Sequence, residues 1–273
     1  MKKPRNTFIV VLLVLIVILF NSANGELIPS EQDGKWGYCN EHGEWLIPRL
    51  WDYVSEFRCG KTAKVGLRME NGNVMLYGII DREGTYLVPC EYFILAGESE
   101  TYFGGENGYY LVSTPDHALE GYYDIENAYF CVPKYQAVDI HNKNDENIIS
   151  VADLDSGFWG YIRTTDEKPM SDFCYIETGP WSNGAAIATS LEQQWILFRD
   201  GTRIAIPVEY NAGLEINNGY FRISDENNKY GLMNLNAVVV TEKWYDFIEI
   251  GENGEFIGYF DEMQETIRIK KAF

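Results

Sequence analysis

The sequence has few of the residues and none of the local motifs that usually mark an active site or a metal site. It contains only three histidines, His42, His117 and His141, which lie in turn-like or polar segments without the spacing of metal ligands. A G-x-S-x-G turn, an H-E-x-x-H helix and a phosphate-binding glycine loop are all missing. The sequence therefore identifies no catalytic residue and no cofactor-binding residue.

Cysteine is scarce and irregularly spaced. The five cysteines include no C-x-x-C pair, so a zinc or redox motif is unsupported. Cys39, Cys90 and Cys131 fall in apolar, strand-like runs, where cysteine behaves as a small buried hydrophobe. One disulfide stays an alternative, but the spacing does not identify the pair.

The sequence lacks an apolar run long enough to cross a bilayer, which takes roughly 20 residues. Its longest run covers only the 13 residues 8–20, after three basic residues and before an Ala-Asn-Gly stretch at 23–25. This layout predicts a secretory signal over 1–25, cleaved before Glu26, and a secreted or cell-surface protein. A retained N-terminal membrane anchor is the alternative.

Basic residues are also few, 22 against 41 acidic residues. Loss of the signal would take the formal charge from −19 to −22 by removing three basic residues. Such a charge repels phosphate backbones and anionic lipid surfaces. We therefore expect no nucleic-acid partner and no peripheral membrane binding beyond the signal, and solubility is the simplest role of the charge.

What the sequence does contain is a repeat, seen first over residues 34–66. This stretch has a short apolar run with Trp36-Gly37, a glycine turn, a run that we expect proline to end or to mark as a sheet edge, and a third run. Three landmarks recur 41 residues later: Gly37 and Gly78, Gly43 and Gly84, Pro48 and Pro89. A shared offset of this size is typical of solenoids, propellers or arrays.

Further copies follow along residues 121–261. The third keeps the frame with one added residue, and Asn127 takes the place of the turn glycine. The fourth opens at Trp159-Gly160, the fifth at Trp195, the sixth at Tyr230-Gly231, and a half copy begins at Gly258. Residues 99–150 are the most irregular part.

Each recurring position of the repeat has a physical role. The aromatic before the glycine supplies apolar area and is expected to be buried between units. The glycine leaves bare backbone for a ring of a neighbouring unit. An Asp-x-x-Gly stretch, such as residues 81–84, predicts a type I turn that closes a hairpin.

No part of residues 26–273 sustains a helical period, so we predict an all-β chain of six and a half short antiparallel hairpin units. The steps between motif positions are unequal, 41, 43, 39, 36, 35 and 27 residues. Unequal units favour an open, solenoid-like array. The alternative is a closed, β-propeller-like ring in which residues 34–40 pair with residues 255–267.

These residues resemble the WG-repeat family, named for the doublet seen here as Trp36-Gly37 and Trp159-Gly160. The resemblance covers roughly residues 34–261. It implies a bacterial β-repeat protein, often exported and without an assigned activity. It transfers no catalytic residue, because the family motif is a packing motif.

Two groups of residues are candidates for binding. Asp153 and Asp155 have the alternation of a calcium loop, although no closing glutamate completes it and ordinary turn chemistry explains them as well. Four tyrosines depart from the repeat pattern, and an exposed subset would suit glycan stacking: Tyr109, Tyr110, Tyr122 and Tyr123.

From these observations we expect an exported, non-catalytic module that presents a surface for a protein or glycan partner. Repeat arrays offer long surfaces and leave their loops free for such a partner. The alternative is an extracellular hydrolase of glycans or peptides that uses acidic residues on the irregular insert.

Overall fold

The computed structural model describes residues 26–58, 60–70, 72, 74–95, 108–140, 147–251, 254–261 and 263–269. These residues form 23 strands and no helix, and every strand pair is antiparallel, so the all-β prediction is confirmed. The predicted signal over 1–25 lies outside the described residues. Within the described part, no helix is long and apolar enough to span a bilayer.

The chain divides into two compact units, Met1–Tyr92 and Phe93–Phe273. In the first, strands β1, β2 and β3 form a three-stranded sheet, and β4, β5, β6 and β7 pair in that order. Their bounds are β1 Ile28–Gln32, β2 Lys35–Cys39, β3 Trp45–Trp51, β4 Tyr53–Val54, β5 Ala63–Arg68, β6 Met75–Ile80 and β7 Tyr86–Leu95. Strand neighbours are thus sequence neighbours, as in a meander of hairpins.

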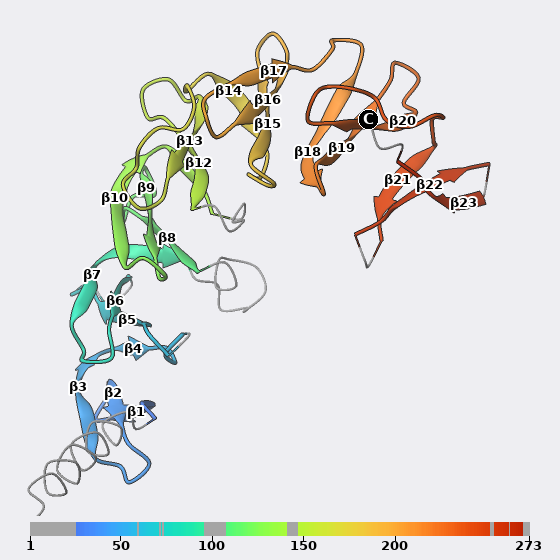
Figure 1. The fold of residues 1–273 in the computed structure, drawn as a ribbon. Coiled ribbons are helices and arrows are strands. Elements are labelled where there is room, and N and C mark those ends of the chain that lie inside the picture. The colour runs from blue at the N-terminus through green and yellow to red at the C-terminus, as the bar shows by residue number, and fades with distance from the viewer. Residues whose placement is uncertain are drawn as a thin grey trace, which may run out of the picture. The chain divides into compact units, whose positions relative to one another are not determined.

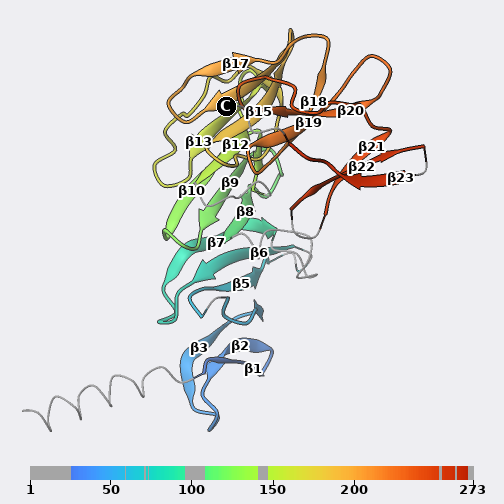
Figure 2. The ribbon, with the colours of Figure 1, turned by 45° about the vertical axis from the view of Figure 1, so that its right-hand side comes forward.

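In the second unit, the end of β7 pairs with β8, which pairs with β9 and then β10. A seven-stranded sheet β11 to β17 and two three-stranded sheets, β18 to β20 and β21 to β23, follow, and no described sheet is closed (Figure 1). Figure 2 shows β8, β9 and β10 side by side again. The bounds are β8 Tyr109–Ser113, β9 Glu120–Asp124, β10 Tyr129–Tyr135, β11 Ala137–Asp139, β12 Ile148–Ala152, β13 Trp159–Arg163, β14 Tyr175–Thr178, β15 Ala185–Ser190, β16 Gln194–Phe198, β17 Arg203–Ala205, β18 Asn211–Asn217, β19 Tyr220–Ser224, β20 Tyr230–Asn234, β21 Phe247–Ile250, β22 Phe256–Phe260 and β23 Met263–Thr266.

The repeat proline lies inside its strand rather than at its end. Trp36 pairs with Trp51 and Tyr38 with Ile47, so a shift of two residues along β2 corresponds to a shift of four residues along β3. The extra residues form a bulge in β3. The same bulge occurs between β6 and β7 and between β9 and β10. A bulge leaves residues outside the ladder, so Pro48 has no ladder bond to donate. The prediction that proline ends the strand was therefore wrong, because β3 continues to Trp51.

The motif glycine faces this bulge. A Cβ added at Gly37 would lie 2.6 Å from the carbonyl oxygen of Ile47, and one at Gly121 would lie 2.3 Å from that of Cys131. At Gly78 the corresponding distance, to the carbonyl oxygen of Val88, is 2.6 Å. In these three copies the bare backbone receives the returning strand of its own unit, whereas a Cβ at Gly258 would lie 2.3 Å from the Tyr245 ring of the preceding copy, as we had expected.

The residue after the motif glycine is the fully buried one. Tyr38 is completely buried in the core of the first unit, whereas Trp36 is half-buried beside the exposed Lys35. The other copies repeat this contrast, with half-buried Tyr77, Trp159 and Tyr230 and buried Ile79, Tyr161 and Leu232. The aromatic before the glycine is therefore less buried than predicted in these copies.

The predicted turns form, with one correction. Oδ1 of Asp81 accepts the N–H groups of Glu83 and Thr85, and Gly84 has a φ of 82°. In the third copy the positive φ falls on Ala128, at 50°, and not on Asn127. The extra residue of that turn moves the left-handed position by one.

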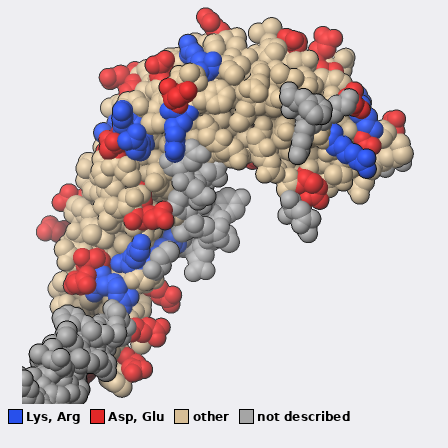
Figure 3. Space-filling model, in the orientation of Figure 1, with Lys and Arg blue, Asp and Glu red and all other residues tan. Residues whose placement is uncertain are grey.

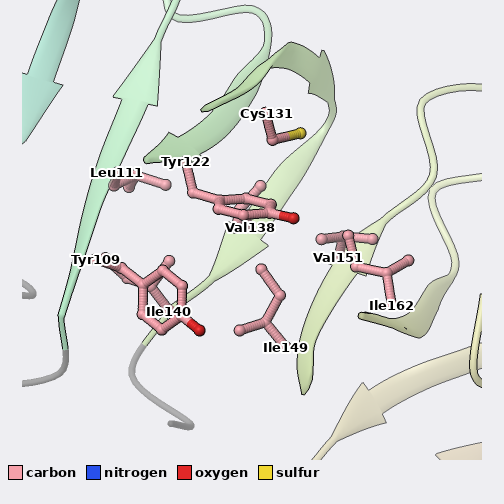
Figure 4. Packing of buried hydrophobic residues seen from close by; sticks show 9 residues of the cluster. All are labelled: Tyr109, Leu111, Tyr122, Cys131, Val138, Ile140, Ile149, Val151 and Ile162. Atoms are coloured by element: carbon pink, nitrogen blue, oxygen red, sulfur yellow. The ribbon is translucent and has the colours of Figure 1, made fainter. Parts of the chain in front are cut away.

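Residues 99–150 are partly outside the described residues, at 96–107 and 141–146. Their described part forms regular strands, and all four tyrosines that we had considered for exposure are at most 2% exposed. In Figure 4 the rings of Tyr109 and Tyr122 lie among aliphatic side chains from β11, β12 and β13. Burial of their rings in this core rules out the predicted stacking surface at these positions.

One short network satisfies the hydroxyl groups of Tyr109 and Tyr122. Tyr122 donates to the carbonyl oxygen of Thr164 at 2.9 Å, and Tyr109 donates to Oγ1 of Thr164 at 3.2 Å. Thr164 in turn donates to Oδ2 of the buried Asp124 at 3.1 Å. A buried polar group costs free energy unless it is paired, so this network lets polar residues occupy the core.

Candidate functional site: the Tyr210 groove

Asp153 and Asp155 occupy a turn. The carboxylate of Asp153 accepts the backbone N–H of Ser156 at 2.9 Å and its hydroxyl at 2.8 Å, and these bonds hold the pKa of Asp153 below its ordinary value. Asp155 is exposed. The part of the chain that the structure describes contains no group of three or more His, Cys, Asp or Glu side chains arranged for a metal ion.

The histidines and cysteines do not converge either. His117 stacks on Phe93 with ring centroids 4.6 Å apart, His42 is exposed beside Glu41, and His141 lies outside the described residues. The four described cysteines are free thiols, and Cys59 is not described. Burial and the nearby Glu167 raise the pKa of the Cys131 thiol to about 12, which makes it a poor nucleophile.

The surface feature best suited to a ligand is a pair of adjoining hollows in the second unit. The larger has a volume of about 640 Å³ and the smaller about 370 Å³. Both are lined by Val208, Tyr210 and Asn211, and we call these two neighbouring hollows together the Tyr210 groove. The remaining lining comes from β14, the β15–β16 turn, the β19–β20 turn and Trp244.

Hydrogen bonds fix the link between β17 and β18, which forms the middle of the groove. The N–H of Tyr210 donates to the carbonyl oxygen of Pro207 at 3.0 Å and closes a turn. The side-chain amide of Gln194, on β16, accepts the N–H of Ala212 at 2.6 Å and donates to its carbonyl oxygen at 2.9 Å. This double contact ties the start of β18 to the neighbouring sheet, so the groove is preformed.

Aromatic and aliphatic side chains supply the apolar part of the groove. The rings of Tyr210 and Trp244 stack with centroids 5.7 Å apart and planes 24° apart. Three aliphatic side chains stand on the surface with large exposed fractions, Ile176 at 49%, Leu191 at 75% and Val208 at 82%. Exposed apolar side chains that gather in one groove mark an interaction site more often than scattered ones do.

Every charged residue of the lining is acidic. They are Glu177, Glu192, Glu209, Asp225 and Glu226, and no lysine or arginine joins them. The backbone N–H groups of Lys229 and Asn227 bond Oδ1 of Asp225 and hold its pKa below the ordinary value. The ammonium group of Lys229 itself pairs with Asp246.

Among the groove carboxylates, Asp225 has a pKa below its ordinary value. A general acid needs a raised pKa near the working pH, whereas Asp225 has a lowered one. The groove lining also contains no histidine, cysteine or lysine.

On the face shown in Figure 3, acidic side chains are scattered with basic ones among them, so this face carries no continuous acidic patch.

Sequence reasoning did not find this groove. Its lining comes from separate links and turns between residues 176 and 244, and their proximity depends on how the sheets pack. One signal was present, namely the apolar residues Leu191 and Val208 in otherwise polar connections next to glutamates.

Comparisons with solved structures give only distant likenesses. Hsv2 of Kluyveromyces lactis matches at 11% identity and a TM-score of 0.35, over 57% of this chain and 55% of that one, so this chain spans about half of its length. BamB from Moraxella catarrhalis matches at 11% identity and a TM-score of 0.32, over 90% of this chain and 80% of that one. The Dos1 propeller matches at 11% identity and a TM-score of 0.33, over 86% of this chain and 72% of that one. At these TM-scores the likenesses support no conclusion about this chain.

No curated protein matches the chain. Among protein families, the WG containing repeat matches residues 36–65. This match covers the unit in which Trp36-Gly37, the turn at Gly43, the bulge at Pro48 and Asp52 occur together. The chain therefore carries a WG repeat at residues 36–65 within an antiparallel β-repeat fold.

Proposed function

We propose that this chain is an exported, non-catalytic repeat module that binds a protein or glycan partner in the Tyr210 groove. The observation that carries the proposal is the preformed groove, in which exposed aliphatic side chains adjoin the stacked Tyr210 and Trp244. The WG repeat supports a packing role for the motif and leaves the connections for binding. No observation on the described residues favours the alternative of a hydrolase.

A binding screen with matched variants tests this function. Purified protein is applied to an array of peptides and an array of glycans, alongside the double variant Leu191→Ser and Val208→Ser. The control is Leu154→Ser with Val238→Ser, which removes the same two residue types from surface sites that are each 52% exposed and outside the groove. We expect binding by wild type and control and its loss in the groove variant. Equal binding by all three, or by none, would contradict the proposal.

We further propose that the repeats form an open array, with export through the signal over 1–25. The unequal repeat steps and the absence of a closed sheet among the described strands support the open form. A compact body of this chain length has a radius of gyration of roughly 18 Å. Small-angle scattering should give a radius of gyration clearly larger than this, and a value of about 18 Å would favour the closed ring.

Export has a separate test. N-terminal sequencing of the exported protein should begin at Glu26.

A further inference from the structure

We infer that the partner of the Tyr210 groove is an extended peptide segment that carries lysine or arginine side chains next to apolar ones. This inference rests on the proposed function, since it names the chemistry of the partner in the same groove. Three observations support it: the charge of the groove lining, its exposed aliphatic side chains and the stacking of its two aromatic rings.

The first step is charge complementarity. The groove lining carries five carboxylates and no cation, and four of them form no ion pair within the described ranges: Glu177, Glu192, Glu209 and Glu226. A cationic segment would meet attraction along both hollows, while an anionic one would be repelled. Nucleic acids and acidic glycans are thus disfavoured, and lysine or arginine side chains fit.

The second step is the apolar content of the groove. Ile176, Leu191 and Val208 are exposed aliphatic side chains, and each lines one or both hollows. A peptide side chain such as leucine would remove this surface from water, at about 25 cal/mol per Å² of apolar area buried. Sugar hydroxyl groups would instead be placed against aliphatic carbon. The lining therefore favours a peptide over a neutral glycan.

The third step concerns the aromatic rings. Glycan binding sites use an open ring face for a sugar to lie on, whereas here Tyr210 and Trp244 stack on each other and both also pack against the buried core of the second unit. The ring edges and the tyrosine hydroxyl stay suited to a peptide backbone, which Asn211 and Asn227 of the lining can also bond. Because the two hollows adjoin, an extended segment can occupy both at once.

Fluorescence anisotropy with defined peptides tests the inference. The probe is a fluorescein-labelled peptide of three Lys-Leu-Gly-Ser repeats, and two comparison peptides replace every lysine by glutamate or every leucine by serine. The binding variant is Glu177→Gln, Glu209→Gln and Glu226→Gln together. The control variant removes the same three charges from exposed sites in the first unit, Glu41→Gln, Glu70→Gln and Glu83→Gln.

We expect the Lys-Leu probe to bind wild type, and both comparison peptides to bind at least about tenfold more weakly, because each lacks one of the two required features. The groove variant should lose at least about tenfold in affinity and the control variant less than about twofold. Equal losses in both variants would show unspecific attraction to an acidic protein and overturn the inference.

The arrays of the preceding section separate this inference from the proposed function. Groove-dependent binding of glycans without binding of the Lys-Leu probe would overturn the peptide inference and leave the binding function intact. Absence of groove-dependent binding to both arrays and to the probe would overturn both.

Discussion

The ammonium group of Lys35 lies 2.7 Å from Oδ1 of Asp52, and this pair joins the first residue of β2 to the residue after β3. Seventeen residues separate the partners, and the same separation joins Lys229 to Asp246 in the sixth copy. Oδ2 of Asp52 also accepts the backbone N–H of Arg68 at 2.8 Å, on the following hairpin. This aspartate thus fastens the start of β2 and the end of β5 to the residue after β3.

Replacing Asp52 should test this fastening. The Arg68 N–H and the Lys35 ammonium hold the pKa of Asp52 below its ordinary 3.8, so its contribution is present above that pH and is lost as the pH falls through the folded-state pKa. We expect Asp52→Asn to lower the free energy of unfolding by about 1 kcal/mol at pH 7. The difference from wild type, measured by urea unfolding, should shrink as the pH drops below 3.8. A pH-independent difference, or an equal loss in the exposed control Glu70→Gln, would contradict this.

The network around Thr164 predicts a second stability effect. Thr164→Val removes the acceptor of Tyr109 and a donor to the buried Asp124. We expect a loss of about 1–3 kcal/mol in the free energy of unfolding, the cost of unpaired buried polar groups. Thr62→Val is the matched control, because Thr62 is also buried but its hydroxyl has no hydrogen-bond partner among the described residues. Equal effects of the two substitutions would show that the network contributes nothing.

The Cys131 thiol should be protected from alkylation. It is fully buried, and its pKa is raised to about 12, so the reactive thiolate is rare at pH 8. Iodoacetamide treatment followed by peptide mass spectrometry should label Cys131 in urea and leave it unlabelled in the native protein. Labelling at the same rate in both conditions would disprove the burial of this side chain.

Calcium should not stabilise the protein through Asp153. Its carboxylate already bonds the N–H and hydroxyl of Ser156. Calcium titrated to millimolar concentration into chelator-treated protein should therefore leave the melting temperature unchanged, because a ligand that binds only the folded state would raise it. A rise that is absent in Asp153→Asn would establish a calcium site there.

The sequence was sufficient for the local features of the fold and insufficient for those that depend on pairing. The alternation of apolar residues and the turn at Asp81 predicted strands and hairpins, because these signals lie within a few residues. The bulge at Pro48 was missed because proline in a strand is compatible with a strand end, a sheet edge or a bulge, and only the pairing distinguishes them. The Lys35–Asp52 pair and the Tyr210 groove join residues from separate elements, and only the folded chain brings them together.

The central claim is that Gly37, the glycine of the first Trp-Gly doublet, leaves room for the bulge at Pro48 of its own unit. A methyl group at Gly37 would lie 2.6 Å from the carbonyl oxygen of Ile47, whereas one at Gly213 would meet its nearest atom at an ordinary 3.6 Å. The most direct test compares the urea unfolding of Gly37→Ala and Gly213→Ala. We predict a loss of about 1–3 kcal/mol for the first, as in overpacked cores, and no loss for the second. Equal stability of Gly37→Ala and wild type would contradict the claim.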